Sequence, residues 1–380
     1  MLIPRKIYPL LEKQLENRAK IILLYGPRQA GKTTLITQLL QNYQNKTIFF
    51  RGEDLRTQEI FSVANLDSLK QATGQAEMLI IDEAQKITNI GISLKLLYDA
   101  TKIRIIASGS SSFDLANKVN EPLTGRTATF TLYPLSLLET PITPPDTSAT
   151  SRLLEFLTYG LYPETITTTG NTEKQFYLNE LVNNYLYRDI LTFETVRKPK
   201  KVIDLLTLLA LQLGSEVSIQ ELSQNLALSK TIVEKYLDIL EKMFVIVNIR
   251  GFSRNLRKEI SKTSKYYFVD LGLRNALIKN FNPSHLRNDG GAMFENLCII
   301  ERIKALANKR EPSNIYFWRT YDQKEIDIIE EKNGKLYAYE CKFSQKNHLP
   351  GSAAHEFLAT YPNATFKTIT PANTIEFLES

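Results

Sequence analysis

The feature that most constrains this chain is a glycine loop placed between an apolar run and a helical pattern. Residues 26–33 read GPRQAGKT and match the pattern G-x-x-x-x-G-K-[ST] without departure. Residues 21–25 are apolar throughout, as in a strand buried on both faces, and the apolar residues of 34–43 recur at helical spacing. This order predicts backbone N–H groups turned onto phosphate oxygens at a helix N-terminus. A chance glycine turn before a helix is the alternative.

The loop pattern predicts a role for its polar side chains. Lys32 would reach the β- and γ-phosphates of a bound nucleotide, and the Thr33 hydroxyl would coordinate Mg²⁺. The complete segment expected to bind nucleotide is Gly26, Pro27, Arg28, Gln29, Ala30, Gly31, Lys32, Thr33 and Thr34.

A second apolar run, residues 78–81, ends in two carboxylates, Asp82 and Glu83. Acidic side chains at the tip of a buried strand are costly unless they meet a cation. We expect Asp82 to hold the Mg²⁺ shell and Glu83 to orient and polarise the attacking water. The alternative is an ordinary acidic first turn of a helix.

Two further segments offer residues for the same site. Residues 103–107 read as a strand that ends in serines, and Ser108 or Ser110 could sense the γ-phosphate or simply form a serine turn. Arg126 precedes another expected strand, residues 127–131. It could contact phosphate in its own or a neighbouring subunit, or form a surface ion pair. The catalytic candidates at this site are therefore Glu83, Lys32 and Arg126.

Composition narrows the class of protein. A chain of 380 residues predicts two or three domains. Two cysteines give neither a disulfide framework nor a metal-binding cluster, which fits a reducing compartment. With no apolar run of membrane-spanning length and no signal-peptide pattern, we expect a cytoplasmic protein without a membrane partner. The net charge is +6, and residues 197–265 alone hold thirteen Lys plus Arg against seven Asp plus Glu. This local surplus indicates DNA as a possible partner.

The order of strand and helix patterns predicts an α/β chain of several parts. Residues 1–140 alternate strands with helices, which favours a parallel sheet covered on both faces, a P-loop NTPase fold. Residues 141–213 begin with a Pro- and Thr-rich linker and continue as a helical segment. We expect a winged-helix-like domain over 214–272 and a restriction-endonuclease-like α/β domain over 273–380.

The winged-helix expectation rests on two helices followed by two strands. Ser218 begins a capping box, and the second helix, 230–243, would turn Ile232, Val233, Tyr236, Leu237 and Leu240 inward. In such a fold the second helix reads a DNA groove and the basic loop after the first strand contacts phosphates. That loop carries Arg250, Arg254, Arg257, Lys258, Lys262 and Lys265. Acid at Glu234, Asp238 and Glu241 leaves open a protein-contact or purely structural module.

A hairpin near the C-terminus carries the other candidate site. Asn333-Gly334 predicts its turn, and counting outward places Asp327 opposite Glu340, with Lys342 two residues further on the same face. Facing carboxylates repel unless a divalent cation lies between them. Asp, then Glu-x-Lys, resembles the PD-(D/E)xK nucleases, and Glu295 could supply a third carboxylate, with Lys342 catalytic. The alternative is a solvated strand face, since Glu325, Glu330 and Glu331 are acidic as well.

Taken in order, these motifs resemble one family along nearly the whole chain. The loop of 26–34, Ile80 to Lys86, Ala107 to Ser111, Leu123 to Arg126, Tyr133 to Ser136, Tyr267 to Leu273, Phe317 to Thr320, Glu325 to Asp327 and Glu340 to Lys342 carry the likeness. The chain resembles the bacterial and archaeal AAA-type P-loop ATPases with a C-terminal domain of unknown function. The resemblance implies ATP binding and hydrolysis with Mg²⁺, a winged-helix middle and a nuclease-like end.

Two functions remain as expectations. The first is an ATPase that acts on nucleic acid or is gated by it, with a nuclease-like domain. The second is a nucleotide-dependent switch that binds a protein partner, with an inactive nuclease-like scaffold. Either could work as a homo-oligomer, and the sequence names neither substrate nor pathway.

Overall fold

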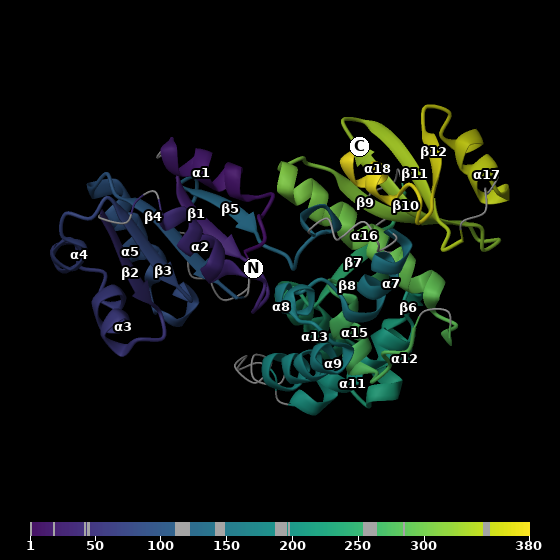
Figure 1. The fold of residues 1–380 in the computed structure, drawn as a ribbon, viewed down its shortest axis with the longest axis horizontal. Helices are drawn as coiled ribbons and strands as arrows, with labels where there is room; N and C mark the ends of the chain where they lie inside the picture. Colours follow the sequence, from purple (N-terminus) through teal and green to yellow (C-terminus); the bar gives the residue numbers. More distant parts are fainter. Residues whose placement is uncertain are drawn as a thin grey trace. The chain divides into compact units, whose positions relative to one another are not determined.

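The computed structural model divides into two compact units. It describes residues 2–17, 20–41, 43, 46–110, 122–140, 149–186, 196, 198–253, 264–283, 286–344 and 350–380. One unit comprises Leu2–Pro134 with Lys242–Phe244, and the other comprises Leu135–Glu241 with Val245–Ser380. Figure 1 draws both, and each is described below by itself.

The first unit is built on a parallel sheet in the order β2-β3-β4-β1-β5. Its strands are β1 (Ile21–Tyr25), β2 (Thr47–Arg51), β3 (Met78–Asp82), β4 (Arg104–Gly109) and β5 (Thr127–Thr131). The parallel α/β fold expected from the sequence is confirmed. Strand β4 lies between β1 and β3, so the ends of three adjacent strands meet at one edge of the sheet.

Helices cover both faces of this sheet because successive side chains of a strand point to opposite sides. Ile22 and Leu24 of β1 belong to a core with α1 and α2, whereas Ile21 and Leu23 belong to a core with α3, α4 and α5. The helices are α1 (Tyr8–Glu16), α2 (Lys32–Leu40), α3 (Leu55–Ser62), α4 (Leu66–Thr73) and α5 (Ile90–Ala100). Burial on both faces explains why the strands read as continuous apolar runs.

The second unit contains one mixed sheet in the order β12-β11-β10-β9-β7-β8-β6. Its strands are β6 (Glu216–Val217), β7 (Ile246–Gly251), β8 (Ser264–Phe268), β9 (Asn314–Arg319), β10 (Glu325–Lys332), β11 (Lys335–Cys341) and β12 (Thr365–Ile369). The parallel pairing of β7 with β9 joins the strands expected in a winged helix to those expected in a nuclease-like domain. The two expected segments therefore share one sheet.

The helices of the second unit are mostly short. They are α7 (Ala149–Tyr159), α8 (Pro163–Thr167), α9 (Asn171–Glu180), α11 (Pro199–Leu211), α12 (Ile219–Leu226), α13 (Lys230–Lys242), α15 (Leu271–Leu277), α16 (Gly290–Lys309), α17 (Ser352–Thr360) and α18 (Thr374–Glu379), with a π-helical segment over Leu181–Leu186. Across the described ranges of both units, no helix combines the length and the apolar character needed to cross a membrane.

The two helices predicted over 219–243 are present, with one correction. The Ser218 hydroxyl accepts a hydrogen bond from the Glu221 N–H at 3.3 Å and begins α12. Helix α13 buries Val233 and Tyr236, but Ile232, expected inward, is 38% exposed. Each residue turns a helix by about 100°, so Ile232 lies beside the buried stripe rather than on it.

Candidate nucleotide site and a second carboxylate cluster

The glycine loop has the backbone that its pattern predicts. Gly31 has φ 96° and ends the loop at the N-terminus of α2, a conformation that residues with a Cβ rarely adopt. At Gly26 a Cβ would lie 2.0 Å from the Leu132 carbonyl oxygen, because the chain after β5 passes directly over the loop. Glycine is thus favoured at position 31 by the backbone conformation and required at position 26 by the close approach of Leu132.

Lys32 is buried at the base of the loop. Its ammonium donates hydrogen bonds to the carbonyl oxygens of Gly26, at 2.8 Å, and Pro27, at 2.9 Å. These bonds hold the lysine within the curve of the loop, at the end of the helix where backbone N–H groups are exposed. A phosphate in the loop would meet this ammonium directly.

Thr33 and Asp82 come together at the edge of the sheet. Thr33 Oγ1 lies 3.1 Å from Asp82 Oδ2, and the Ser108 hydroxyl donates a hydrogen bond to Asp82 Oδ1. Ser108 reaches Asp82 because β4 is the neighbour of β3. A hydroxyl and a carboxylate at this separation are hard oxygen ligands of the kind Mg²⁺ takes beside a phosphate. The residues therefore fit the expected cation.

Glu83 takes part in a second set of contacts. Its Oε2 accepts hydrogen bonds from Gln85 Nε2, at 2.5 Å, and from the Ser110 hydroxyl, at 3.2 Å. Gln85 Nε2 also donates to Ser110 Oγ at 3.1 Å. Sequence reasoning missed Gln85. Its position two residues after Glu83 is the signal in the sequence that could have marked it, and the structure places it in the 3-10 helix Ala84–Lys86.

Arg5 is another residue whose role the sequence did not reveal. Its guanidinium is buried and donates to the carbonyl oxygens of Ala30 and Tyr133, each at 2.7 Å. It therefore ties the glycine loop to the segment that follows β5. The glycine loop is therefore held in part by a side chain from outside the loop motif, since Arg5 precedes α1 in the chain.

Arg126 does not lie near the loop, which corrects one expectation. Its carbonyl oxygen accepts a hydrogen bond from the Ile21 N–H, at the start of β1, whereas the loop follows the end of β1. Five strand residues separate the two ends, about 16 Å at 3.3 Å per residue. The guanidinium pairs instead with Asp99, Nε to Oδ1 at 2.9 Å. The parallel topology thus places Arg126 at the opposite end of β1 from the loop.

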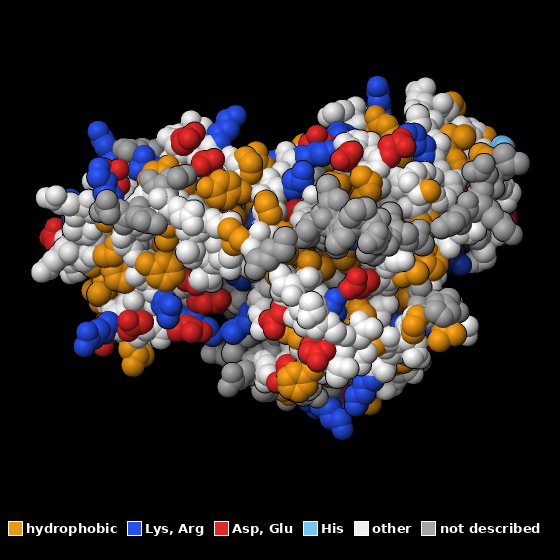
Figure 2. All heavy atoms as spheres, in the orientation of Figure 1, with side chains coloured by type: hydrophobic (Ala, Val, Ile, Leu, Met, Phe, Trp, Pro, Cys, Tyr) orange, Lys and Arg blue, Asp and Glu red, His pale blue; other side chains and the backbone are white. Residues whose placement is uncertain are grey.

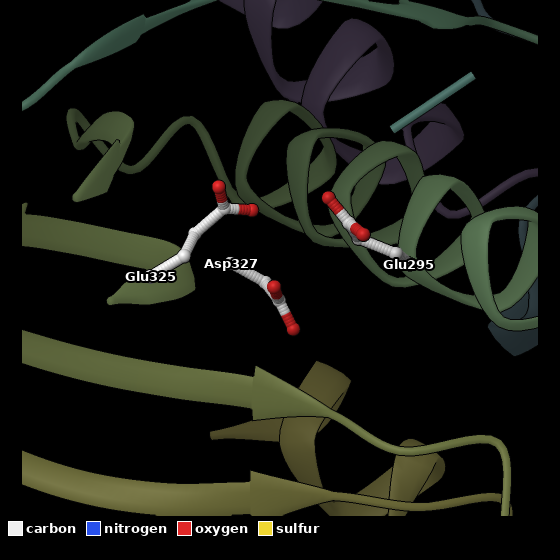
Figure 3. A group of neighbouring side chains, drawn as sticks. All are labelled: Glu295, Glu325 and Asp327. Atoms are coloured by element: carbon white, nitrogen blue, oxygen red, sulfur yellow. The ribbon is translucent and has the colours of Figure 1, made fainter. Parts of the chain in front are cut away.

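A second cluster of carboxylates lies in the other unit. Glu295 of α16 and Glu325 and Asp327 of β10 turn toward one another (Figure 3), and one oxygen of each lies within 4.8 Å of the others. Glu325 and Asp327 share a strand face because they are two residues apart. Sequence reasoning had given Glu325 no role.

Glu340 is not part of this cluster, contrary to the expectation. The predicted register holds from Lys332–Lys335 to Ile328–Tyr339. Beyond that point the β9–β10 pairing is irregular between Ile326 and Ile329, and such irregularities redirect side chains. Asp327 Oδ2 accepts a hydrogen bond from the Cys341 N–H at 2.7 Å, whereas Glu340 pairs with Lys342 at 2.5 Å.

Lys265 supplies the positive charge inside the cluster. Its ammonium lies 3.3 Å from Glu295 Oε1 and also bonds Glu325 Oε1, and the side chain is 1% exposed. The Tyr267 hydroxyl donates to the same Glu295 oxygen at 2.5 Å. Lys265 was expected to contact DNA from an exposed loop. Its burial on β8 among carboxylates corrects that expectation.

The electrostatics of the cluster follow from burial. Burial raises the pKa of the Asp327 carboxyl to about 7, and the Glu295 carboxylate raises it as well. Burial also raises the pKa of Glu295, against the opposing effect of Lys265. The pKa of Lys265 is raised, because Glu295 and Glu325 outweigh the lowering effect of burial. The cluster thus contains an internal cation, and the raised pKa of about 7 places the titration of the Asp327 carboxyl near neutral pH.

This donor set does not fit the divalent cation expected there. An ammonium already bridges two of the three carboxylates, and Glu340, one of the expected ligands, pairs elsewhere. A metal ion at the same place would have to displace Lys265 and leave its charge buried, which is costly.

Three family models match parts of the chain. An AAA domain matches residues 18–140, and two domains of unknown function match residues 150–284 (DUF8612) and 290–369 (DUF4143). An uncharacterized protein of Mycobacterium tuberculosis is 29% identical over 347 residues, with 90% of this chain and 74% of that protein covered. An uncharacterized protein of Methanocaldococcus jannaschii is 27% identical, with 76% and 67% covered.

Among solved structures, a Walker-type ATPase of Pyrococcus abyssi is similar with a TM-score of 0.50 and 18% identity. The match covers 73% of this chain and 96% of that chain and shows the fold alone. The parallel sheet and the glycine loop agree with the match of residues 18–140 to the AAA domain, and the first unit has the P-loop NTPase fold.

Proposed function

We propose that this chain binds ATP with Mg²⁺ at the glycine loop and hydrolyses it. The contact of Thr33 with Asp82, at 3.1 Å, carries the proposal because it unites two motifs that lie 49 positions apart in the sequence. A Mg²⁺ ion bound there would neutralise charge on the phosphates. Lys32 and the N–H groups of residues 26–34 would hold the phosphates, and Glu83 would orient the attacking water.

The dependence of nucleotide binding on Mg²⁺ tests this assignment. A fluorescent ATP analogue is titrated into the wild-type chain with and without Mg²⁺, and into Thr33→Val and Asp82→Asn. We expect both variants to lose the part of the affinity that Mg²⁺ provides. Thr37→Val is the matched control, because Thr37 lies one turn along α2 and its hydroxyl donates to the Thr33 carbonyl oxygen at 2.8 Å rather than to Asp82. Variants that keep the full effect of Mg²⁺ would contradict the site.

For the role of ATP turnover, two proposals stand. The first, action on nucleic acid, is supported by the basic surplus of residues 197–265. Arg254, Arg257, Lys258 and Lys262, which carry much of that surplus, lie outside the described residues. On the face shown in Figure 2, Lys and Arg side chains are interspersed with Asp and Glu rather than gathered in one patch.

The second proposal is a nucleotide-dependent switch that binds a protein partner. Two observations favour it. Glu234, Asp238 and Glu241 are exposed along α13, the helix that would otherwise enter a DNA groove, and acid there repels phosphate. In the C-terminal cluster an ammonium takes the place between carboxylates that a nuclease would give to a metal. We therefore favour a switch whose nuclease-like part is a scaffold.

Incubation with supercoiled plasmid separates the two proposals. The protein is supplied with Mg²⁺ or Mn²⁺, with and without ATP, beside Lys342→Ala. We expect intact plasmid under every condition, from protein that hydrolyses ATP. Nicking that disappears in Lys342→Ala would overturn the scaffold assignment. DNA binding that falls steeply with salt would support the first proposal without cleavage.

Two remaining roles stay predictions within this proposal. Ser108 or Ser110 would sense the γ-phosphate through Asp82 and Glu83, which they contact. Arg126 would reach nucleotide only in a neighbouring subunit, which requires a homo-oligomer and the release of Asp99.

A further inference from the structure

Gln85, Glu83 and Ser110 are joined pairwise by three hydrogen bonds. Its amide nitrogen has two N–H donors, and one points to Glu83 Oε2 at 2.5 Å while the other points to Ser110 Oγ at 3.1 Å. The Ser110 hydroxyl in turn donates to Glu83 Oε2 at 3.2 Å. Gln85 and Ser110 are 6% and 7% exposed, so water competes little for these bonds.

Gln85 Nε2 and the Ser110 hydroxyl both donate to the same oxygen of the Glu83 carboxylate, Oε2. Two bonds to Oε2 from different directions fix the plane of the Glu83 carboxylate as well as its position. Within the described residues, no hydrogen bond is directed at Oε1. That oxygen is thus the acceptor that remains for the proton of a water molecule.

The backbone supports this geometry. Glu83 has φ 52°, a left-handed conformation that is uncommon for a residue with a Cβ, and the 3-10 helix Ala84–Lys86 follows at once. This tight turn brings Gln85 back beside Glu83, two residues earlier. Ser110 arrives from the tip of β4, the strand next to β3. Because the ends of β3 and β4 are adjacent, Ser108 bonds Asp82 and Ser110, two residues later, bonds Glu83.

We propose that Gln85, acting with Ser110, is a positioning residue for ATP hydrolysis that holds the Glu83 carboxylate in the orientation needed to align the attacking water. This inference rests on the hydrolysis proposed above. In this proposal Gln85 acts through Glu83, to which it donates a hydrogen bond. Misplacement of a reacting group by about 1 Å lowers rates on the order of 100-fold, so the effect on turnover is large while nucleotide binding is unchanged.

A double-mutant cycle with Glu83→Gln tests the proposal. Gln85→Met keeps the length and bulk of the side chain and removes both donors. We expect it to lower kcat by roughly 10- to 100-fold with the dissociation constant of a fluorescent ATP analogue within about twofold. In a Glu83→Gln background the same change should lower kcat no further, because the group that Gln85 positions is already gone. A structural role would lower kcat equally in both backgrounds.

Ser110 provides a conservative rescue. Ser110→Thr retains the hydroxyl and should keep most of the turnover, whereas Ser110→Ala should lower kcat in the same way as Gln85→Met. Thermal unfolding of each variant confirms that the fold is retained. If the wild-type chain binds ATP without hydrolysing it, the proposed function and this inference fail together. If it hydrolyses ATP and Gln85→Met is neutral, or additive with Glu83→Gln, this inference alone is overturned.

Discussion

The hydroxyl of Thr33, in the first turn of α2, lies 3.1 Å from the carboxylate of Asp82 at the end of β3, although β3 and the strand that precedes α2, β1, are not neighbours in the sheet. Strand β4 separates β1 from β3, and its Ser108 holds the other oxygen of Asp82. Three strand ends therefore define one place where a cation and a phosphate can meet. This relationship turns two separate sequence motifs into one candidate site.

Glu83→Gln should retain nucleotide binding and slow hydrolysis. The substitution keeps the shape of the side chain and removes the carboxylate that would orient water, an effect of roughly 10²- to 10⁴-fold for a general base. Binding of a fluorescent ATP analogue and release of phosphate are measured on the same sample, with the exposed Glu53→Gln as control. Loss of binding instead would show that the division of roles between Asp82 and Glu83 is wrong.

Arg5→Ala should weaken nucleotide binding although Arg5 is distant in sequence from the loop. Its guanidinium satisfies the carbonyl oxygens of Ala30 and Tyr133, each at 2.7 Å, and buried acceptors without a donor cost about 1–3 kcal/mol each. Urea unfolding and ATP-analogue binding should both report the loss. Lys13→Ala, which removes an exposed cation from α1, should change neither. Equal behaviour of the two variants would contradict the role given to Arg5.

Asp327→Asn should stabilise the protein at pH 8 and have little effect near pH 4. The pKa of Asp327 is about 7 in the fold, chiefly through burial, against about 3.9 for an ordinary Asp. Between these values the folded state holds a proton that the unfolded chain has released, so stability falls as pH rises from about 4 to about 7. Above that range the loss is complete, and Asn avoids it.

The measurement is thermal unfolding from pH 4 to pH 8, with Asp322→Asn, an exposed change, as control. The difference in midpoint between Asp327→Asn and the wild-type chain should grow with pH. A difference that is constant or reversed in sign would show that the fold does not raise the pKa of Asp327.

Lys265→Met should destabilise the second unit and create a site for divalent cations. Removal of one partner from a buried ion pair costs about 3–5 kcal/mol, because the carboxylates keep their charge without compensation. Millimolar Mn²⁺ should recover stability in this variant more than in the wild-type chain, and the exposed Lys235→Met should show no such gain. Mn²⁺ binding by the wild-type cluster, unchanged in Lys265→Met, would refute the internal-cation account.

Local patterns could point to the residues of the candidate nucleotide site because these residues lie in short contiguous segments. The loop and the end of β3 are each a few residues long, and parallel strand ends necessarily meet at one edge. Gln85 and Arg5 escaped prediction because their contacts depend on how a turn folds back and on which segment crosses the loop. Neither property is visible in a local pattern.

For the C-terminal cluster, counting residues outward from the hairpin turn predicted the strand register but not which carboxylates come together. The Asn333-Gly334 turn fixed the register of five residue pairs, from Lys332–Lys335 to Ile328–Tyr339. Glu325 joins the cluster because it lies two residues from Asp327 on the same strand, whereas Glu340 on β11 pairs with Lys342. Lys265 could not be placed at all, since its position depends on β7 pairing with β9, a contact between segments far apart in sequence.

Steady-state ATP hydrolysis by the wild-type chain and by Lys32→Ala tests the central claim most directly. The account predicts Mg²⁺-dependent release of phosphate that Lys32→Ala abolishes, since the ammonium at the base of the loop is lost. The exposed Lys70→Ala should retain full turnover as the control. Turnover that survives in Lys32→Ala, or a folded wild-type chain with no turnover at any Mg²⁺ concentration, would contradict the account.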